Sequence, residues 1–234
     1  MAKTIGGMAQ KYFANMSKQI RYGQMLGMNQ TAFEVKKRLE KEIVKVFDNP
    51  TAQTKRSIYV VKAKKTDLKV TIKIKDQAAQ GLTPADYLSP QIFGGTREKK
   101  RSEQLWGEYW VPGRKQRLNK YGNISGGQIT KLLSITRSFE EVGFNANVTS
   151  TSKGAGTAKK IFRVWGKKHQ RRKSNLLPGI YKRVRKRIQP LIIFIKQPKY
   201  KKRFNFEKVT TDNFFKLIDK NIDIGIEKAM KDAK

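Results

Sequence analysis

The amino-acid sequence predicts an α+β fold, in which an antiparallel sheet of about four strands is packed with helices and carries long interface loops. Stretches near both ends repeat apolar residues every three or four positions, as amphipathic helices do. Shorter stretches between them alternate apolar with polar residues or are apolar throughout, as strands do. The 234 residues suffice for one core. We therefore expect a single domain over 1–234, with an N-terminal helical segment (1–47), a loop insertion (77–127) and a basic loop (148–187).

The N-terminal helical segment is predicted to hold two helices. Residues 7–23 carry apolar side chains at helical spacing, and Gly23 and Gly27 are expected to break the helix after them, since glycine is a poor helix former. A second apolar stripe begins near Thr31. Pro50 follows the end of this second helix, because the residue before a proline avoids the helical region.

Two strands joined by a turn are predicted next. Residues 57–62 form the first strand, and residues 67–76 form the second after a turn at 64–67. The second strand alternates between apolar and polar side chains, which places one face on a core and a cationic face outward. Its apolar residues are Leu68, Val70, Ile72 and Ile74.

The rest of the chain is predicted to alternate loops with further elements. The loop insertion is rich in Gly and Pro and holds one helix over 96–109, for which Thr96 is a candidate N-cap. The basic loop is rich in Ser, Thr, Gly and Lys. The same periodic patterns predict a helix at 128–139, strands at 160–166 and 190–197, and a final helix from Val209.

The charge balance of the chain is strongly one-sided. There are 52 Lys and Arg against 18 Asp and Glu, a formal net charge of +34 at pH 7. Such a surface repels itself unless an anionic partner compensates it, and nucleic acid, an acidic protein and an anionic membrane all qualify. No membrane is expected, because the longest apolar run, 191–195, is far shorter than the ~20 residues of a spanning helix. The N-terminus has no hydrophobic block typical of a secretory signal.

One segment of the chain concentrates this positive charge. Between Glu141 and Glu207 there is no acidic residue. The cations of this segment are expected either to follow phosphates, each releasing a counterion, or to dock on an acidic protein surface. We expect contact with a protein partner or DNA at Arg171, Arg172, Lys173, Lys182, Arg183, Arg185, Lys186 and Arg187.

No catalytic site, metal site or cofactor is expected. The chain has no cysteine, which excludes disulfides, thiolate zinc sites and a cysteine nucleophile. His169 is the only histidine and stands among cations, without partners at a recognisable spacing. Asp86, Glu98 and Lys100 are of the types that a metal-dependent nuclease uses, but no predicted strand places the last two on one face. We therefore expect a protein that is not an enzyme.

Several stretches resemble a known family. Residues 87–97 read Tyr-Leu-Ser-Pro-Gln-Ile-Phe-Gly-Gly-Thr-Arg, and they follow Asp-Asn-Pro-Thr at 48–51. Further along the chain come Tyr-Gly-Asn at 121–123 and, before the last helix, Pro198 and Tyr200. This layout resembles virion proteins of tailed bacteriophages, of the kind called minor tail, tail completion or neck proteins. The matching motifs are structural and not catalytic.

The resemblance implies a structural virion protein that assembles as a ring at the head–tail junction. Such a ring joins the portal side to the tail around the DNA channel. Its implied partners are further copies of the same chain, portal or adaptor proteins and tail proteins, with possible non-specific contact with packaged DNA. The implied location is the virion, after synthesis in the host cytoplasm.

The subunit interface of such a ring is expected at Gly94, Gly95, Trp106, Tyr109 and Trp110. Two adjacent glycines allow backbone conformations closed to other residues, and Trp and Tyr are favoured at protein contacts. The three aromatic residues are alternatively core residues of the helix predicted there. An alternative function is that of a non-enzymatic nucleic-acid-binding protein, such as a ribosome-associated protein, because mobile basic loops suit RNA as well.

Overall fold

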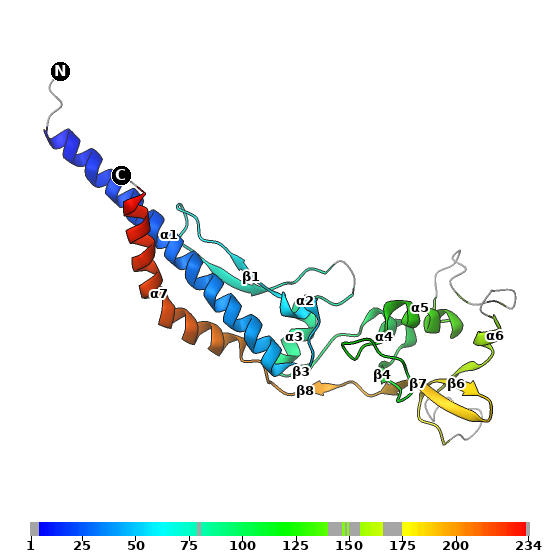
Figure 1. The fold of residues 1–234 in the computed structure, drawn as a ribbon. Helices are drawn as coiled ribbons and strands as arrows, with labels where there is room; N and C mark the ends of the chain where they lie inside the picture. The colour runs from blue at the N-terminus through cyan, green and yellow to red at the C-terminus, as the bar shows by residue number, and fades with distance from the viewer. Residues whose placement is uncertain are drawn as a thin grey trace. The chain divides into compact units, whose positions relative to one another are not determined.

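The computed structural model describes residues 5–78, 81–139, 147, 149, 155–165 and 175–232. It confirms the α+β class, since helices are combined with antiparallel sheets of two and four strands (Figure 1). The chain divides into two compact units. Unit 1 comprises Met1–Ala78, Thr83–Phe93 and Lys202–Lys234, and unit 2 comprises Ala79–Leu82 and Gly94–Lys201. Compactness alone does not define a domain that folds independently, so the single domain over the whole chain stays a prediction.

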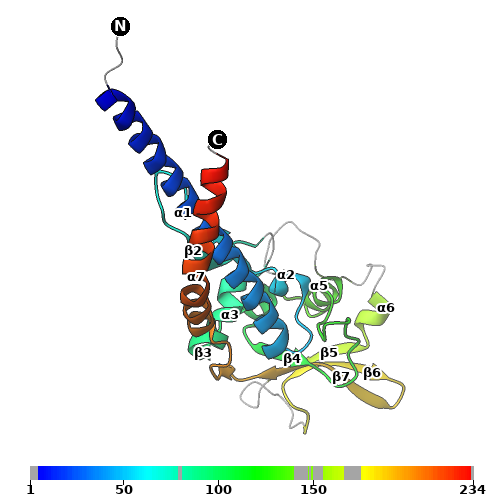
Figure 2. The same cartoon turned by 60° about the vertical axis from the view of Figure 1, so that its left-hand side comes forward.

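Unit 1 begins with one long helix, α1 (Ile5–Val46), and the predicted break at Gly23 and Gly27 is wrong. The last helix, α7 (Phe206–Lys231), lies beside α1 and crosses it at these glycines (Figure 2). A Cβ built on Gly23 would lie 2.5 Å from the Cα of Ile226. The glycines therefore allow two helix backbones to touch, and the packing of α7 compensates for their weak helix propensity.

The predicted strand pair of unit 1 is confirmed in shorter form. Strands β1 (Ile58–Val61) and β2 (Thr71–Ile74) pair antiparallel, with Ile58 opposite Ile74. A single turn of helix, α2 (Ala52–Lys55), leads into β1. Ile58 of β1 lies fully inside the core, while Lys73 of β2 is exposed, as the alternation of that strand predicts.

Unit 1 also contains a helix, α3 (Pro84–Phe93), where the Gly- and Pro-rich composition predicted a loop. Pro84 is tolerated in the first turn, because the N–H that it lacks would have no acceptor within the helix. Two reciprocal hydrogen bonds cap the N-terminal end of α3. The Thr83 N–H donates to Asp86 Oδ2 at 2.8 Å, and the Asp86 N–H donates to Thr83 Oγ1 at 3.2 Å. The Thr-x-x-Asp spacing of a capping box was the missed signal.

The core of unit 1 is built around the C-terminal half of α1. Val35, Leu39 and Ile43 are spaced by four residues, which places them on one stripe of the helix. They are fully buried together with Ile58 of β1 and Phe204, which precedes α7. The apolar spacing recognised in the sequence is therefore the core-facing stripe.

Unit 2 is built on a four-stranded antiparallel sheet in the order β4-β7-β6-β5. Strand β6 lies inside the predicted basic loop (148–187) and corrects that prediction, whereas β5 and β7 confirm predicted strands. A short two-stranded sheet pairs β3 (Gly95–Thr96) with β8 (Lys199–Tyr200). The four strands of the larger sheet are β4 (Tyr109–Pro112), β5 (Ile161–Val164), β6 (Gly179–Val184) and β7 (Arg187–Ile195).

The described part of unit 2 has short helices: α4 (Arg101–Trp106), α5 (Gly126–Ile135) and α6 (Ala155–Ala158). Helix α5 confirms the helix predicted at 128–139. The helix predicted at 96–109 is wrong over most of its length, because β3 precedes α4 and β4 follows it. The loop insertion predicted at 77–127 therefore carries regular elements rather than loop alone.

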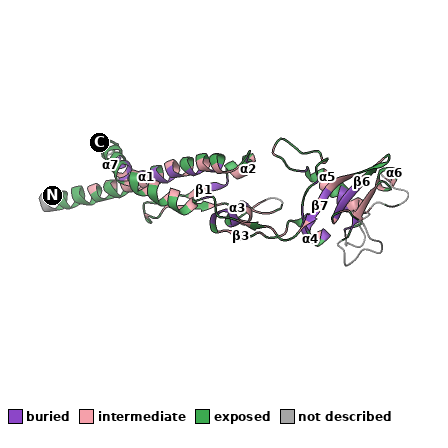
Figure 3. Ribbon diagram, turned by 90° about the horizontal axis from the view of Figure 1, so that it is seen from below, coloured by how far each residue is buried: buried purple, intermediate pink, exposed green. Residues whose placement is uncertain are grey.

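Local signals explain where α4 begins and ends. The N–H of Lys100 donates to Glu103 Oε2 at 2.8 Å, so the helix begins there and not at Thr96. Gly107 ends it with φ of 76°, a conformation that glycine adopts freely. Buried residues concentrate on β6, β7 and around α4 (Figure 3). The core of unit 2 consists of Trp106, Trp110, Ile124, Leu132, Leu133, Ile180, Ile192 and Phe194.

Candidate functional site

The candidate site with the strongest support is the turn between β6 and β7. Val184 pairs with Arg187, which leaves Arg185 and Lys186 as a two-residue turn. Arg185 has φ of 54°. In this left-handed region glycine and asparagine are usual, and other residues cost about 1–2 kcal/mol. The turn therefore holds an arginine where the backbone favours glycine.

Five of the eight predicted contact cations gather at this turn, and we call residues 182–187 the basic hairpin tip. Their side chains are exposed except that of Lys182, which is half-buried. Cations this close together repel one another, so an anion bound at the tip would lower their electrostatic free energy. The exposed members of the tip are Arg183, Arg185, Lys186 and Arg187.

In the described part of the chain, no carboxylate forms an ion pair with the basic hairpin tip. Among the residues that the structure describes, side-chain ion pairs join Lys36 with Glu40 and Arg97 with Glu103, and neither pair involves the tip. The sequence from 142 to 206 also contains no Asp or Glu. Within the described residues the tip thus has no carboxylate partner, and solvent ions or another molecule can supply its counter-charge.

Aromatic rings lie beside the tip on the sheet. The guanidinium carbon of Arg183 is 5.9 Å from the ring centroid of Phe162 on β5. Phe162 in turn stacks on Tyr181, with centroids 6.0 Å apart and rings inclined by 22°. Burial raises the pKa of the Tyr181 hydroxyl. These rings belong to the packed sheet, so the tip is carried by a rigid element and Arg183 keeps a cation–π contact with it.

A second arginine on β5, Arg163, has a structural role. One of its N–H groups donates to the carbonyl of Trp106 at 2.7 Å, and its guanidinium carbon lies 3.8 Å from the ring centroid of Trp165. Burial lowers the pKa of Arg163, while the nearby carboxylate of Glu108 acts in the opposite direction. Its side chain is therefore committed to the interior of unit 2 and not to a partner.

Three predicted contact residues, Arg171, Arg172 and Lys173, lie outside the described residues, as does His169. The structure therefore brings together the five cations of the basic hairpin tip. The contribution of the other three to the same site stays a prediction.

The aromatic residues predicted at a subunit interface are core residues of unit 2. Trp106, Tyr109 and Trp110 are only 3%, 9% and 8% exposed. The Trp106 ring N–H donates to Thr136 Oγ1 at 3.0 Å, and the Trp110 ring N–H donates to Ser102 Oγ at 3.1 Å. Their rings are thus buried in unit 2, and the ring N–H groups of both tryptophans have hydrogen-bond acceptors within the chain. The alternative interpretation, that they form core, is the correct one, although Tyr109 and Trp110 lie on a strand.

Gly94 and Gly95 have the backbone conformations that favour glycine. Their φ values are 80° and 96°. Gly95 is exposed and pairs with Tyr200 between β3 and β8. The conformational reason for two glycines is therefore present, while their place at a subunit interface stays a prediction.

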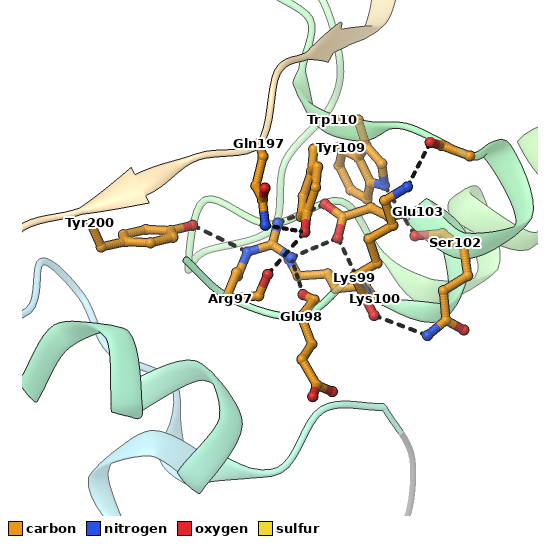
Figure 4. A network of polar contacts seen from close by, with 12 residues as sticks. Arg97, Glu98, Lys99, Lys100, Ser102, Glu103, Tyr109, Trp110, Gln197 and Tyr200 are labelled. Atoms are coloured by element: carbon orange, nitrogen blue, oxygen red, sulfur yellow. Dashed lines mark hydrogen bonds and ion pairs between the residues drawn. The ribbon is translucent and has the colours of Figure 1, made fainter. Parts of the chain in front are cut away.

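A buried polar network, which the sequence analysis missed, holds the start of unit 2 together (Figure 4). The Arg97 guanidinium donates to both carboxylate oxygens of Glu103 at 2.6 Å, and Glu103 is fully buried. Arg97 Nε donates to the Tyr200 hydroxyl at 3.1 Å, and the Tyr109 hydroxyl donates to the Arg97 carbonyl at 3.0 Å. Bidentate geometry of this kind is the strongest form of the arginine–carboxylate pair. The network links β8, β4 and α4.

The electrostatics of this network identify it as structural. Burial alone would raise the pKa of Glu103, but hydrogen bonds from Arg97 and from the Lys100 N–H outweigh it and hold the pKa below its ordinary value of 4.5. The hydrogen bonds to Glu103 raise the pKa of Arg97 in spite of burial. Both groups therefore stay charged at neutral pH and are paired with each other.

Asp86, one of the nuclease-type residues, has a structural role at a helix end. Asp86 accepts the Thr83 N–H at the start of α3. In the parts of the chain that the structure describes, no group of three His, Asp or Glu could hold a metal ion. A cavity of about 280 Å³ in unit 1 contributes one carboxylate and no histidine, so it does not support the nuclease alternative either. It is lined by Ile92, Phe93, Phe206, Glu207, Thr210 and Thr211.

Over the described ranges, no helix combines the length and the apolar content that crossing a bilayer requires. Comparisons of the chain with protein-family models, curated proteins and solved structures give no match.

Proposed function

We propose that this protein is a structural, non-enzymatic component of a tailed-bacteriophage virion that assembles as a ring at the head–tail junction. In this proposal the basic hairpin tip binds an anionic partner, either an acidic virion protein or packaged DNA. The observation that carries the proposal is the tip itself, with five cations and no carboxylate partner among the described residues. Such a group gains free energy on an anionic surface, because bound cations release counterions and complementary charges set the docking register.

The backbone conformation at Arg185 supports a functional role for the charge of the tip. Arg185 occupies a left-handed conformation in which glycine would be less strained. Strained residues that persist in a turn are often retained for what their side chains do. An exposed arginine at this position therefore favours a binding role for the tip over a merely solvated surface.

The contacts of residues 87–97, which carry the phage resemblance, support a structural role for this stretch. Leu88 and Ile92 are buried in unit 1. The Gln91 carbonyl accepts the N–H groups of Arg203 and Phe204, both at 2.9 Å, and Arg203 Nε donates to Gln91 Oε1 at 2.6 Å. These residues fix the chain ahead of α7 against α3. The motif thus maintains the fold, which fits a protein whose task is positional.

A charge-reversal variant tests the proposal. In a phage genome that encodes this chain, Arg183→Glu, Arg185→Glu and Arg187→Glu together should yield heads without attached tails in electron micrographs. A matched triple reversal on exposed lysines of α1, at 37, 41 and 45, should leave assembly normal. Normal tailed particles from the hairpin variant would refute the role of the tip.

Nucleic-acid binding outside a virion is the second candidate, favoured by the clustered cations beside Phe162. Fluorescence anisotropy of the full chain separates the two candidates. The probes are duplex DNA, a folded RNA hairpin and polyglutamate, each at about 0.05 M and 0.2 M salt. The virion proposal expects weak, sequence-independent DNA binding that collapses at the higher salt concentration. Tight and selective binding to the folded RNA at the higher salt concentration would favour a ribosome-associated protein.

A further inference from the structure

The helix pair of unit 1 exposes two surfaces of opposite charge, and the first is the N-terminal part of α1. We call residues 7–21 the arm. Tyr12 and Phe13 are each 65% exposed, and Met8 and Ile20 are exposed beside them. All the charged residues of the arm are cations, and they are exposed: Lys11, Lys18 and Arg21.

The apolar side of the arm continues a packed helix face. Gly23 and Gly27 lie against α7, and Ile20 and Met16 precede Gly23 by three and seven residues. Residues at these spacings fall on the same side of a helix. Helix α1 extends beyond the C-terminal end of α7, so α7 leaves the N-terminal part of the arm uncovered (Figures 1 and 2). The arm therefore presents a packing surface to solvent.

The second surface is the outer face of α7, which we define by Asp212, Asp219, Asp223 and Glu227. Spacings of seven, four and four residues place these four exposed carboxylates on one side of the helix. Phe215, 70% exposed, lies along the same side. Lys208, Lys216 and Lys220 are exposed cations at spacings of three, four or seven residues from these carboxylates. Apolar and acidic side chains thus occur together here.

The acidic character of this face is unusual in this chain. Helix α7 contains five of the 18 acidic residues, beside five lysines, in a protein of net charge +34. The ion pairs found among the described residues, Lys36 with Glu40 and Arg97 with Glu103, do not involve the outer face of α7. These carboxylates are therefore available to cations of another molecule.

We propose that the arm of one copy of this chain docks on the outer face of α7 of a second copy. The cations of the arm complement the carboxylates of the outer face. Both surfaces also expose aromatic side chains that a contact excluding water would bury. The arm cannot reach the outer face within one chain. The opposite side of α7, at Asn221, Gly225 and Ala229, is the side buried against the continuous helix α1.

The contact therefore joins different patches on the two partners. A head-to-tail interface of this kind closes into a ring or propagates as a filament. The inference rests on the self-assembly stated in the proposed function and deepens it by naming the surfaces. It does not depend on the basic hairpin tip, which lies in unit 2.

Charge exchange tests the contact in the full chain. One variant carries Lys11→Asp and Lys18→Asp on the arm, and the other carries Asp219→Lys and Asp223→Lys on the outer face. Sedimentation velocity at about 0.15 M salt should show self-association weakened on the order of 100-fold in each variant, because like charges then face one another. An equimolar mixture should recover the assembly, because each variant offers the other an oppositely charged surface.

A control variant and the possible outcomes separate failure of the arm contact from failure of the ring proposal. Lys37→Asp with Lys41→Asp makes the same charge change on exposed positions of α1 outside the arm and should assemble like the wild type. Circular dichroism verifies that each variant is folded. If the wild type assembles while both variants and their mixture assemble equally well, the contact is wrong and the ring proposal stands. A wild type that stays monomeric at every concentration and salt tested overturns both.

Discussion

Glu103 is the residue whose truncation should damage the fold most. It is fully buried, and its partner Arg97 has a side chain that is only 10% exposed. Glu103→Ala would leave the guanidinium buried without its carboxylate, which should cost about 3–5 kcal/mol of unfolding free energy. Chemical denaturation followed by tryptophan fluorescence measures this. The exposed neighbour provides the control, since Glu98→Ala should change the value by about 0.5 kcal/mol or less.

The same carboxylate predicts a pH dependence of stability. The pKa of Glu103 is lower in the folded chain than its ordinary value of 4.5. On acidification the unfolded state therefore takes up the proton first, so the stabilisation is complete above pH 4.5 and is lost as pH falls through the lower, folded pKa. The difference in unfolding free energy between the wild type and Glu103→Gln should shrink below pH 4.5. A difference that is constant from pH 7 to pH 3 would contradict this.

Arg185 should show opposite effects on stability and on binding. Arg185→Gly relieves the left-handed backbone and should raise the unfolding free energy by about 1 kcal/mol, while removing one cation from the tip. Its affinity for duplex DNA should fall. Lys186→Gly removes the same charge without relieving a left-handed residue, so it should weaken binding and also lower stability. Equal stability of the two variants would show that the turn is not strained.

At the scale of elements, the crossing of α1 and α7 depends on the absence of side chains. A Cβ on Gly27 would lie 2.5 Å from the Cα of Ile222 and from the carbonyl oxygen of Asn221, both backbone atoms that cannot move aside. Gly27→Ala should therefore cost about 1–3 kcal/mol in thermal unfolding. Gly7→Ala is the matched control on the same helix, since no atom lies within 4 Å of its Cβ position. It should stabilise the protein by up to about 1 kcal/mol.

The helix crossing also shows why packing dominates local propensity here. Asn221 Nδ2 donates to Thr31 Oγ1 at 3.0 Å in the buried contact, and Thr31 Oγ1 donates to the Gly27 carbonyl at 2.9 Å. A buried polar pair that is satisfied in this way adds specificity to a close backbone contact. The helix therefore continues through two glycines because a partner helix occupies the space above them.

At the scale of the whole molecule, the net charge of +34 should make stability and binding respond to salt in opposite directions. Raising the salt concentration from about 0.02 M to 0.5 M screens self-repulsion, so the thermal midpoint of the isolated protein should rise. Over the same range its affinity for duplex DNA should fall, because counterion release is the source of that affinity. The hairpin variant with Arg183, Arg185 and Arg187 changed to Glu should show a smaller salt response in both measurements. Parallel changes of stability and affinity would contradict the electrostatic account.

Features that depend on a short window of sequence could be predicted without the structure. Apolar stripes along α1 and α7 and the alternation in β2 were predicted because each pattern reports which side of one element is buried. The concentration of cations that forms the basic hairpin tip was likewise visible, since charge is a property of residue types. In contrast, α3 was taken for a loop because its Pro and Gly neighbours outweighed the capping pair of Thr83 and Asp86.

The tertiary structure decided everything that depends on residues distant in sequence. Gly23 became a site of close packing only because Ile226, some two hundred positions away, lies against it. Trp106 and Trp110 became core, and Arg97 found Glu103 in a buried pair, once α4 and the strands had closed around them. Local periodicity records which face of an element avoids water. Periodicity does not identify the residues against which that face packs. The free energy of a contact depends on both partners, and these come together only when the chain folds.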